Sequence, residues 1–219
     1  MALSLANVIL DVRYRLNEAT AAFWTDAQIT SWIQEGTRVV SSKGLLYETE
    51  VALTLVADQL SYTSTDVLEI VHAYYTNAAG GAGNFKGLIK ISPMKIGNLA
   101  TSSAGIPKYY ALWNRKTYIW PLPTAAVVTA TGKVNLMCCK ETDDITALAD
   151  EYQHLAVVYA AACAKQKDEK FQEATNLFAQ FYSDLAFERE DKINREEDAF
   201  GDFQIRGSSA PTGGQRAQR

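Results

Sequence analysis

The chain has 219 residues, of which 47% are hydrophobic and 21% are charged, and its formal net charge is −4. These proportions are typical of a folded globular protein and exclude a disordered chain. The negative charge argues against a protein that binds DNA through bulk electrostatic attraction. The sequence contains no run of about 18 apolar residues, so we expect no transmembrane helix and no membrane partner.

Two helices are expected before residue 45. Residues 3–18 place apolar side chains at the i, i+3, i+4 and i+7 spacing of an amphipathic helix. The charged residues of this segment, which fall largely on its other faces, are Asp11, Arg13, Arg15 and Glu18. Thr25 and Gln28 have the spacing of a capping box, which predicts a second helix from there to about Ser41. Gly36 lies inside that helix, where glycine is unfavourable, so we expect a close helix contact there.

From residue 46 to about residue 139 the apolar period shortens from 3.6 towards 2, which predicts strands. A hairpin is expected around residues 114–116, and Pro121 and Pro123 end it because proline cannot donate to a ladder. The predicted strands are Tyr47–Val56, Gln59–Tyr62, Val67–Tyr75, Lys86–Ile91, Lys108–Trp113, Thr117–Trp120 and Thr131–Cys139.

The last third is again predicted to be helical. Asp150 is expected to cap a helix over residues 151–166, and the many alanines of this helix allow neighbours to approach it from several sides. A longer helix is expected from Glu169 to about Asp198. Its apolar stripe stops at Leu185, so its charged continuation is expected to project into solvent or onto a partner.

The predicted fold class is therefore α+β. A helical bundle is formed by the N- and C-terminal helices, and a β-rich lobe is inserted between them. The expected divisions are an N-terminal helix pair over 1–45, the β-rich lobe over 46–142, a C-terminal helix pair of the same bundle over 143–199, and a flexible C-terminal docking tail over 200–219.

No catalytic, metal or cofactor site is predicted. The three cysteines, Cys138, Cys139 and Cys163, form no metal-ligand spacing and no disulfide framework. The glycines of residues 80–83 lack the strand, helix and lysine context of a phosphate loop. The acidic pairs at 143–144 and 150–151 occupy positions where carboxylates cap helices. We therefore expect a protein that is not an enzyme.

Five aromatic residues occur within twelve positions, and two interpretations of them remain open. They fill the core of the β lobe or a subunit interface, or they form a stacking platform for a glycan or a nucleic-acid base. These residues are Tyr109, Tyr110, Trp113, Tyr118 and Trp120.

Four phrases in a fixed order carry a family resemblance. They are FWTDAQITSWI at 23–33, GIPKYY at 105–110, YIWPLP at 118–123 and DEYQHLAVVYAA at 150–161. Together they resemble the head-to-tail adaptor (connector) proteins of tailed bacteriophages, over about residues 3–190. The resemblance supplies no catalytic motif, because this family works through surfaces.

The resemblance implies a structural virion protein at the head-tail interface that is made in the host cytoplasm. Such proteins form rings, typically of twelve copies, under the portal protein. The ring extends the DNA channel without sequence-specific binding, and it provides the surface on which the tail or the next connector protein assembles. The family's C-terminal segment commonly docks on the portal. In this chain we expect the docking residues to be Phe200, Phe203, Ile205 and Arg206.

A second hypothesis comes from another functional class. In this alternative the chain is a tail-associated binding module whose aromatic cluster recognises a glycan or a host surface.

Overall fold

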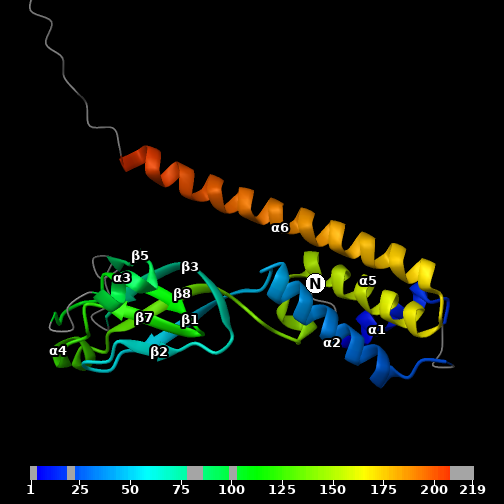
Figure 1. Ribbon diagram of the computed structural model, residues 1–219, viewed down its shortest axis with the longest axis horizontal. Helices are drawn as coiled ribbons and strands as arrows, with labels where there is room; N and C mark the ends of the chain where they lie inside the picture. Colours follow the sequence, from blue (N-terminus) through cyan, green and yellow to red (C-terminus); the bar gives the residue numbers. More distant parts are fainter. Residues whose placement is uncertain (1–3, 19–22, 78–85, 99–102, 208–219) are drawn as a thin grey trace, which may run out of the picture.

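The computed structural model describes residues 4–18, 23–77, 86–98 and 103–207, and it is an α+β protein, as the sequence predicts (Figure 1). Side chains of the longest helix are described as far as residue 194. The glycine-rich residues 80–83 and the tail from residue 208 onward lie outside the described residues.

Four long helices share one hydrophobic core. Helix α5 is central, because α1, α2 and α6 all pack against it, and every residue from Leu155 to Ala162 is buried. Small side chains along α5 let three helices approach it at once. The four helices are α1 (Leu5–Arg15), α2 (Asp26–Lys43), α5 (Asp150–Lys167) and α6 (Phe171–Gly207).

The contact of α2 with α5 is close at Gly36, as expected. A Cβ atom added at Gly36 would lie 3.0 Å from the Cβ of Tyr159. Glu35 lies next to Gly36 on α2, and its Oε1 accepts a hydrogen bond of 3.0 Å from the hydroxyl of Tyr159 on α5. A glycine is therefore required here by the separation of the two helix axes rather than by a turn.

A buried arginine organises the connection between α1 and α2, although the sequence pattern places it off the apolar stripe. Arg13 is 4% exposed, and its Nη2 donates to the carbonyl of Trp24 at 2.8 Å and to Asp26 Oδ1 at 2.6 Å. Its Nη1 lies 3.3 Å from Glu18 Oε2. Glu18 in turn accepts hydrogen bonds from the backbone N–H groups of Phe23 and Trp24. These polar contacts thus hold the connection in place beside the apolar packing of Trp24 on Trp32, whose ring centroids are 5.1 Å apart.

The predicted cap at the start of α2 is confirmed, whereas the predicted cap at the start of α5 is not. Thr25 and Gln28 form the expected capping box at the start of α2. The expected cap at Asp150 is wrong, because α5 begins at Asp150 itself and the preceding Ala149 provides no side-chain cap. An acid in the first turn still interacts favourably with the helix dipole. Asp144 caps the short helix η1 (Ile145–Ala147) by accepting from the N–H of Thr146 at 2.9 Å.

Two four-stranded sheets are built from the residues between α2 and α5, and they share a second hydrophobic core. The first sheet, in spatial order, contains β1 (Glu48–Thr54), β8 (Lys133–Lys140), β3 (Val67–Thr76) and β4 (Lys86–Gly87). The second contains β2 (Ser61–Thr63), β7 (Lys116–Trp120), β6 (Tyr109–Trp113) and β5 (Ile89–Lys90). The short helices α3 (Pro93–Asn98) and α4 (Ala125–Thr129) accompany them.

The hairpin of β6 and β7 forms as predicted. Asn114 and Arg115 at its tip have φ values of 48° and 56°, which match the twist of a two-residue hairpin turn. The single strand expected over Lys86–Ile91 is wrong, because β4 pairs with β3 in one sheet and β5 pairs with β6 in the other. The buried Leu88 lies between them, where the chain passes from one sheet to the other.

The last helix is longer than the sequence analysis anticipates. The prediction ends it near Asp198, whereas α6 continues to Gly207 and includes the first eight residues of the segment that we expected to be a flexible tail. No proline occurs between Phe171, where α6 begins, and Pro211, so no residue of this stretch prevents the helix from continuing.

Replacing Gly36 with valine should lower the free energy of unfolding by roughly 2 kcal/mol, because a larger side chain must separate α2 from α5. Urea-induced unfolding followed by circular dichroism measures this change. The control is Gln34→Val on the exposed face of the same helix, which should change stability by less than about 0.5 kcal/mol. Equal stability of the two variants would contradict the close contact.

Replacing Arg13 with methionine should destabilise the protein by roughly 2 kcal/mol, because Glu18 loses its buried partner and two hydrogen bonds to the connection disappear. The matched control is Arg15→Met, since Arg15 is exposed on the same helix. If both variants unfold at the same urea concentration, Arg13 does not organise this corner.

Candidate functional site

Helix α6 links the helical core to the first sheet. It begins at the far end of the helical bundle, packs on α5, and runs above the strands (Figure 1). Among its described side chains, the buried apolar ones are Ala174, Phe181 and Leu185. Beyond Leu185 the one buried residue among the described side chains of α6 is Lys192, which is 8% exposed.

Lys192 binds three groups where the helical bundle meets the sheet. Its Nζ lies 2.8 Å from Glu48 Oε1 and 3.2 Å from Cys139 Sγ, and it also donates to the carbonyl of Leu45. Glu48 and Cys139 are paired residues on β1 and β8, so the sheet register brings them to one place. This ammonium therefore holds α6 against the start of β1 and the end of β8.

Lys192 is protonated, and therefore positively charged, at neutral pH. Burial opposes its protonation, but the hydrogen bonds to Glu48 and Cys139 outweigh that effect, so the pKa of Lys192 lies above its ordinary value. A raised pKa means that the contribution of Lys192 to stability is complete at neutral pH. It is lost only when the pH rises through that pKa in strongly alkaline solution.

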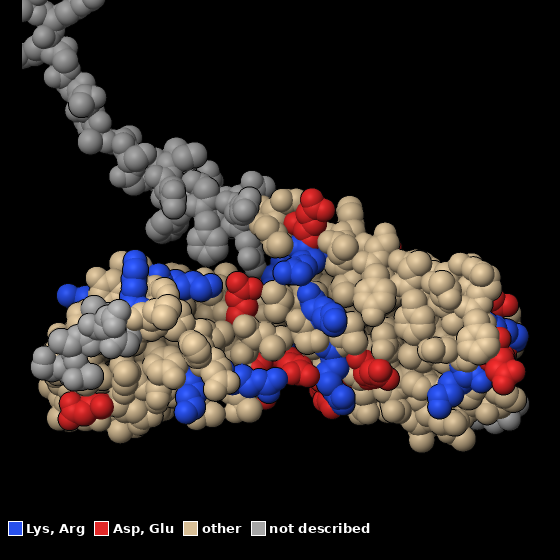
Figure 2. Space-filling view, in the orientation of Figure 1, with Lys and Arg blue, Asp and Glu red and all other residues tan. Residues whose placement is uncertain are grey.

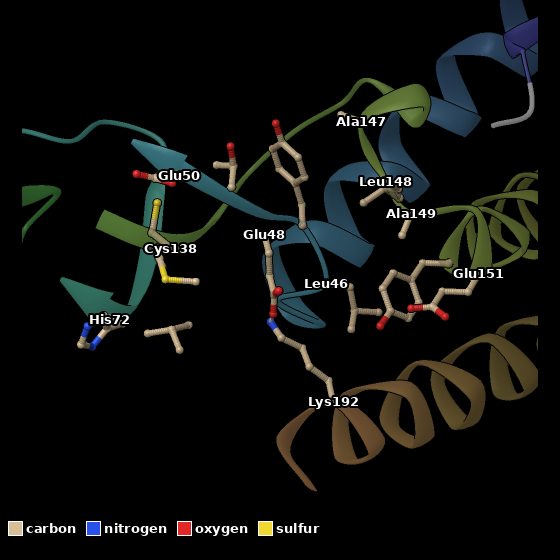
Figure 3. Close-up of a pocket in the computed structure, with 15 residues that line it drawn as sticks. Leu46, Glu48, Glu50, His72, Cys138, Ala147, Leu148, Ala149, Glu151 and Lys192 are labelled. Atoms are coloured by element: carbon tan, nitrogen blue, oxygen red, sulfur yellow. Dashed lines mark ion pairs between the residues drawn. The ribbon is translucent and has the colours of Figure 1, made fainter. Parts of the chain in front are cut away.

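Two open cavities flank the Lys192 contact. The larger, of about 780 Å³, is bordered by the first sheet, the start of α5 and Lys192, with Leu46, Met137 and Tyr152 among its apolar walls (Figure 3). The smaller, of about 470 Å³, lies on the side of Leu45, Glu69 and Ile193. Lys192 lines both cavities, and its contact with Glu48 and Cys139 therefore lies between them.

The predicted aromatic cluster divides between the two faces of the second sheet. Tyr110 is 2% exposed and belongs to the core that the sheets share. The register places the other four on the opposite face, where Tyr109 and Trp120 are paired with ring centroids 5.7 Å apart and Trp113 is 51% exposed. Tyr118 lies between them, opposite Ala111. Tyr110 therefore belongs to the core, whereas the other four aromatic residues share the opposite face of the sheet.

The predicted docking residues belong to the end of α6. The backbone of Phe200, Phe203, Ile205 and Arg206 lies in the last two turns of that helix. Their side chains lie outside the part of the chain whose side chains the structure describes.

The described residues contain no group of three or more histidine, cysteine, aspartate or glutamate side chains placed to hold a metal ion. Burial raises the pKa of Cys138 to about 11 and that of Cys163 to about 12, so both remain uncharged thiols at neutral pH. His154 contacts the carbonyl of Glu151 through Nδ1 at 2.7 Å within its own helix. Among the described helices, none is both long and apolar enough to cross a membrane.

A comparison with protein-family models matches nearly the whole chain to one family. The model of the SU10 adaptor protein family matches residues 3–205, which include the helices, both sheets and almost all of α6. The chain belongs to the SU10 adaptor protein family. The resemblance to the adaptors of tailed bacteriophages is thereby confirmed, and this adaptor is a structural phage protein. The family match does not favour the glycan-binding alternative. No curated protein matches the chain.

Sequence reasoning missed Lys192 as a link between the helices and the sheet of this adaptor. It lies in a run of charged residues that is typical of a solvated helix face. The signal available in the sequence was weak: Lys192 is seven residues after Leu185 and eleven after Phe181, and it continues their helical face.

Replacing Lys192 with methionine should loosen the C-terminal half of α6, because Glu48 and the carbonyl of Leu45 lose their cationic partner. Amides of residues 188–207 should exchange hydrogen at least about 10-fold faster, which hydrogen-exchange mass spectrometry measures, while those of α5 stay unchanged. The control is Lys43→Met at the exposed end of α2. Unchanged exchange in α6 would show that Lys192 does not hold the helix.

Proposed function

We propose that this adaptor forms a ring, of twelve copies, under the portal protein of its phage. The ring extends the DNA channel and carries the surface to which the tail or the next connector protein attaches. The observation that carries this proposal is the family match over residues 3–205, which spans both hydrophobic cores and the helix that joins them.

The end of α6 is the portal-docking element in this proposal. Fifteen residues follow Lys192 to the end of the helix, and at 1.5 Å per residue they extend about 22 Å past the last described buried contact. Phe200, Phe203 and Ile205 are apolar residues in an otherwise polar and charged stretch, and such residues require a partner groove. Arg206 supplies a polar contact beside them.

The division of the chain follows from the same proposal. Residues 1–45 and 143–199 form the bundle, residues 46–142 form the β-rich lobe, and residues 200–219 dock on the portal. Docking residues in the last turns of a helix are better positioned than the same residues in a flexible tail, since less conformational entropy is lost on binding.

The net charge of −4 supports passage of DNA rather than its retention. Proteins bind DNA tightly when their Lys and Arg side chains contact many phosphates and release the counterions of the DNA. A channel wall with a negative net charge makes few such contacts, so it binds the genome weakly. We propose that the ring contacts genomic DNA without reading its sequence, and that the protein is made in the host cytoplasm before it joins the virion.

Deleting residues 199–219 should abolish binding to purified portal rings of the same phage and leave the fold intact. The point variant Phe203→Asp should weaken binding strongly, because a carboxylate would be buried without a partner. The control is its neighbour, Gln204→Asp. Co-sedimentation followed by electron microscopy measures binding and shows whether a second ring stacks on the portal. Portal binding by the truncated protein would refute the docking assignment.

A further inference from the structure

The outward half of α6 is uncharged over most of its packed length. Between residues 171 and 187, one side of the helix faces the core through Ala174, Phe181 and Leu185. A stripe at helical spacing on the outward side exposes Phe171, Thr175, Ala179, Tyr182 and Ala186. The exposed residues farther round the helix, Gln172, Asn176, Gln180 and Ser183, are polar but uncharged. Glu173 is the one exposed charged residue in this stretch, and it is paired with Lys165 at 2.7 Å.

This surface differs from that of an ordinary solvated helix. An amphipathic surface helix carries charged side chains opposite its apolar stripe, as α2 does with the exposed Glu35 and Arg38. On α6, by contrast, Tyr182 is 52% exposed and Phe187 is 68% exposed. Figure 2 shows a broad area without charged residues over the helical part of the molecule, with charges gathered at its margins.

Helix α1 carries a second apolar face. Val8 and Val12 point into the core and are fully buried, whereas Leu10 is 58% exposed and Tyr14 is 85% exposed on the other side of the helix. Leu10 and Tyr14 are four residues apart and so lie one above the other. In Figure 1 α5 separates α6 from α1, so the two apolar faces lie on different sides of the bundle.

We propose that the outward face of α6 in one copy binds the α1 face, around Leu10 and Tyr14, of a neighbouring copy. This inference rests on the proposed ring and names the surfaces that build it. Two unlike apolar faces on different sides of one bundle suit a head-to-tail contact, which repeats from copy to copy and closes into a ring. A symmetric contact between two α6 faces would leave the α1 face of every copy exposed to water.

The length of the α6 stripe is compatible with a specific interface. From Phe171 to Ala186 it is about 22 Å long. Each aromatic ring contributes roughly 150–250 Å² when it becomes fully buried, and specific protein interfaces bury about 800 Å² on each partner. Exposed aromatic rings on one side of a helix are typical of an interaction site.

The test uses single charges at exposed positions that the fold does not need. Ala186→Glu alters the α6 face, Leu10→Glu alters the α1 face, and Gln34→Glu on the exposed face of α2 is the control. Self-association of the full chain is measured by sedimentation velocity, alone and in the presence of portal rings. We expect each face variant to associate at least about 100-fold more weakly than the wild type, because a carboxylate is buried unpaired. The control should associate like the wild type.

Mixing the two face variants distinguishes a head-to-tail contact from a symmetric contact. Ala186→Glu retains an intact α1 face and Leu10→Glu retains an intact α6 face, so an equimolar mixture should form one heterodimer and nothing larger. Homodimers of Leu10→Glu alone would instead indicate a symmetric α6 contact and overturn the proposal.

Two further outcomes separate this inference from the proposed function. If all variants form rings like the wild type, the assigned surfaces are wrong and the adaptor ring stands. If the wild type neither associates nor binds the portal, the proposed function fails, and this inference fails with it.

Discussion

The whole structure depends on the burial of α5 on all sides. A helix can be surrounded by three others only where its side chains are small enough for close approach, and the alanines of α5 meet that requirement. Gly36 allows the same close approach from α2, where it lies against Tyr159. Because α1 and α2 come from the first fifth of the chain and α6 from its last quarter, this packing brings the first and last long helices together. The strands are thereby left as one continuous segment between α2 and α5.

The second constraint is the Lys192 contact, which joins two cores that share no residue. A buried ammonium is costly to desolvate, so it persists only where several partners meet it. Glu48, Cys139 and the carbonyl of Leu45 come from three places in the sequence, and they converge because β1 and β8 are paired at that register. Among the described side chains of α6, Lys192 is the buried one that contacts this sheet, and a cavity lies on either side of it.

These features suit a protein that works through surfaces. An adaptor must keep its shape while neighbours bind to it, and a bundle with one central helix leaves the outer faces of α1, α2 and α6 available. The outer face of α2 is polar, whereas those of α1 and α6 carry exposed apolar residues such as Tyr14 and Phe187. The same helix that packs on α5 through its first half extends past Lys192 in its second half, so the proposed assembly surfaces lie on one continuous helix.

The sequence by itself determined the local elements, because helical and strand periods, the capping box at Thr25 and the turn after Trp113 are set by near neighbours. It also determined the family, since the order of short phrases is a property of the chain. The tertiary structure alone decided the burial of Arg13 and Lys192, whose partners lie on other elements, and the division of the 86–91 segment between two sheets. It also decided which of the five clustered aromatics enters the core, because strand register assigned Tyr110 to one face and its neighbours to the other. These features depend on which distant segments pair with each other, and the local periodicity of a sequence does not encode that pairing. For this reason only the tertiary structure decided them.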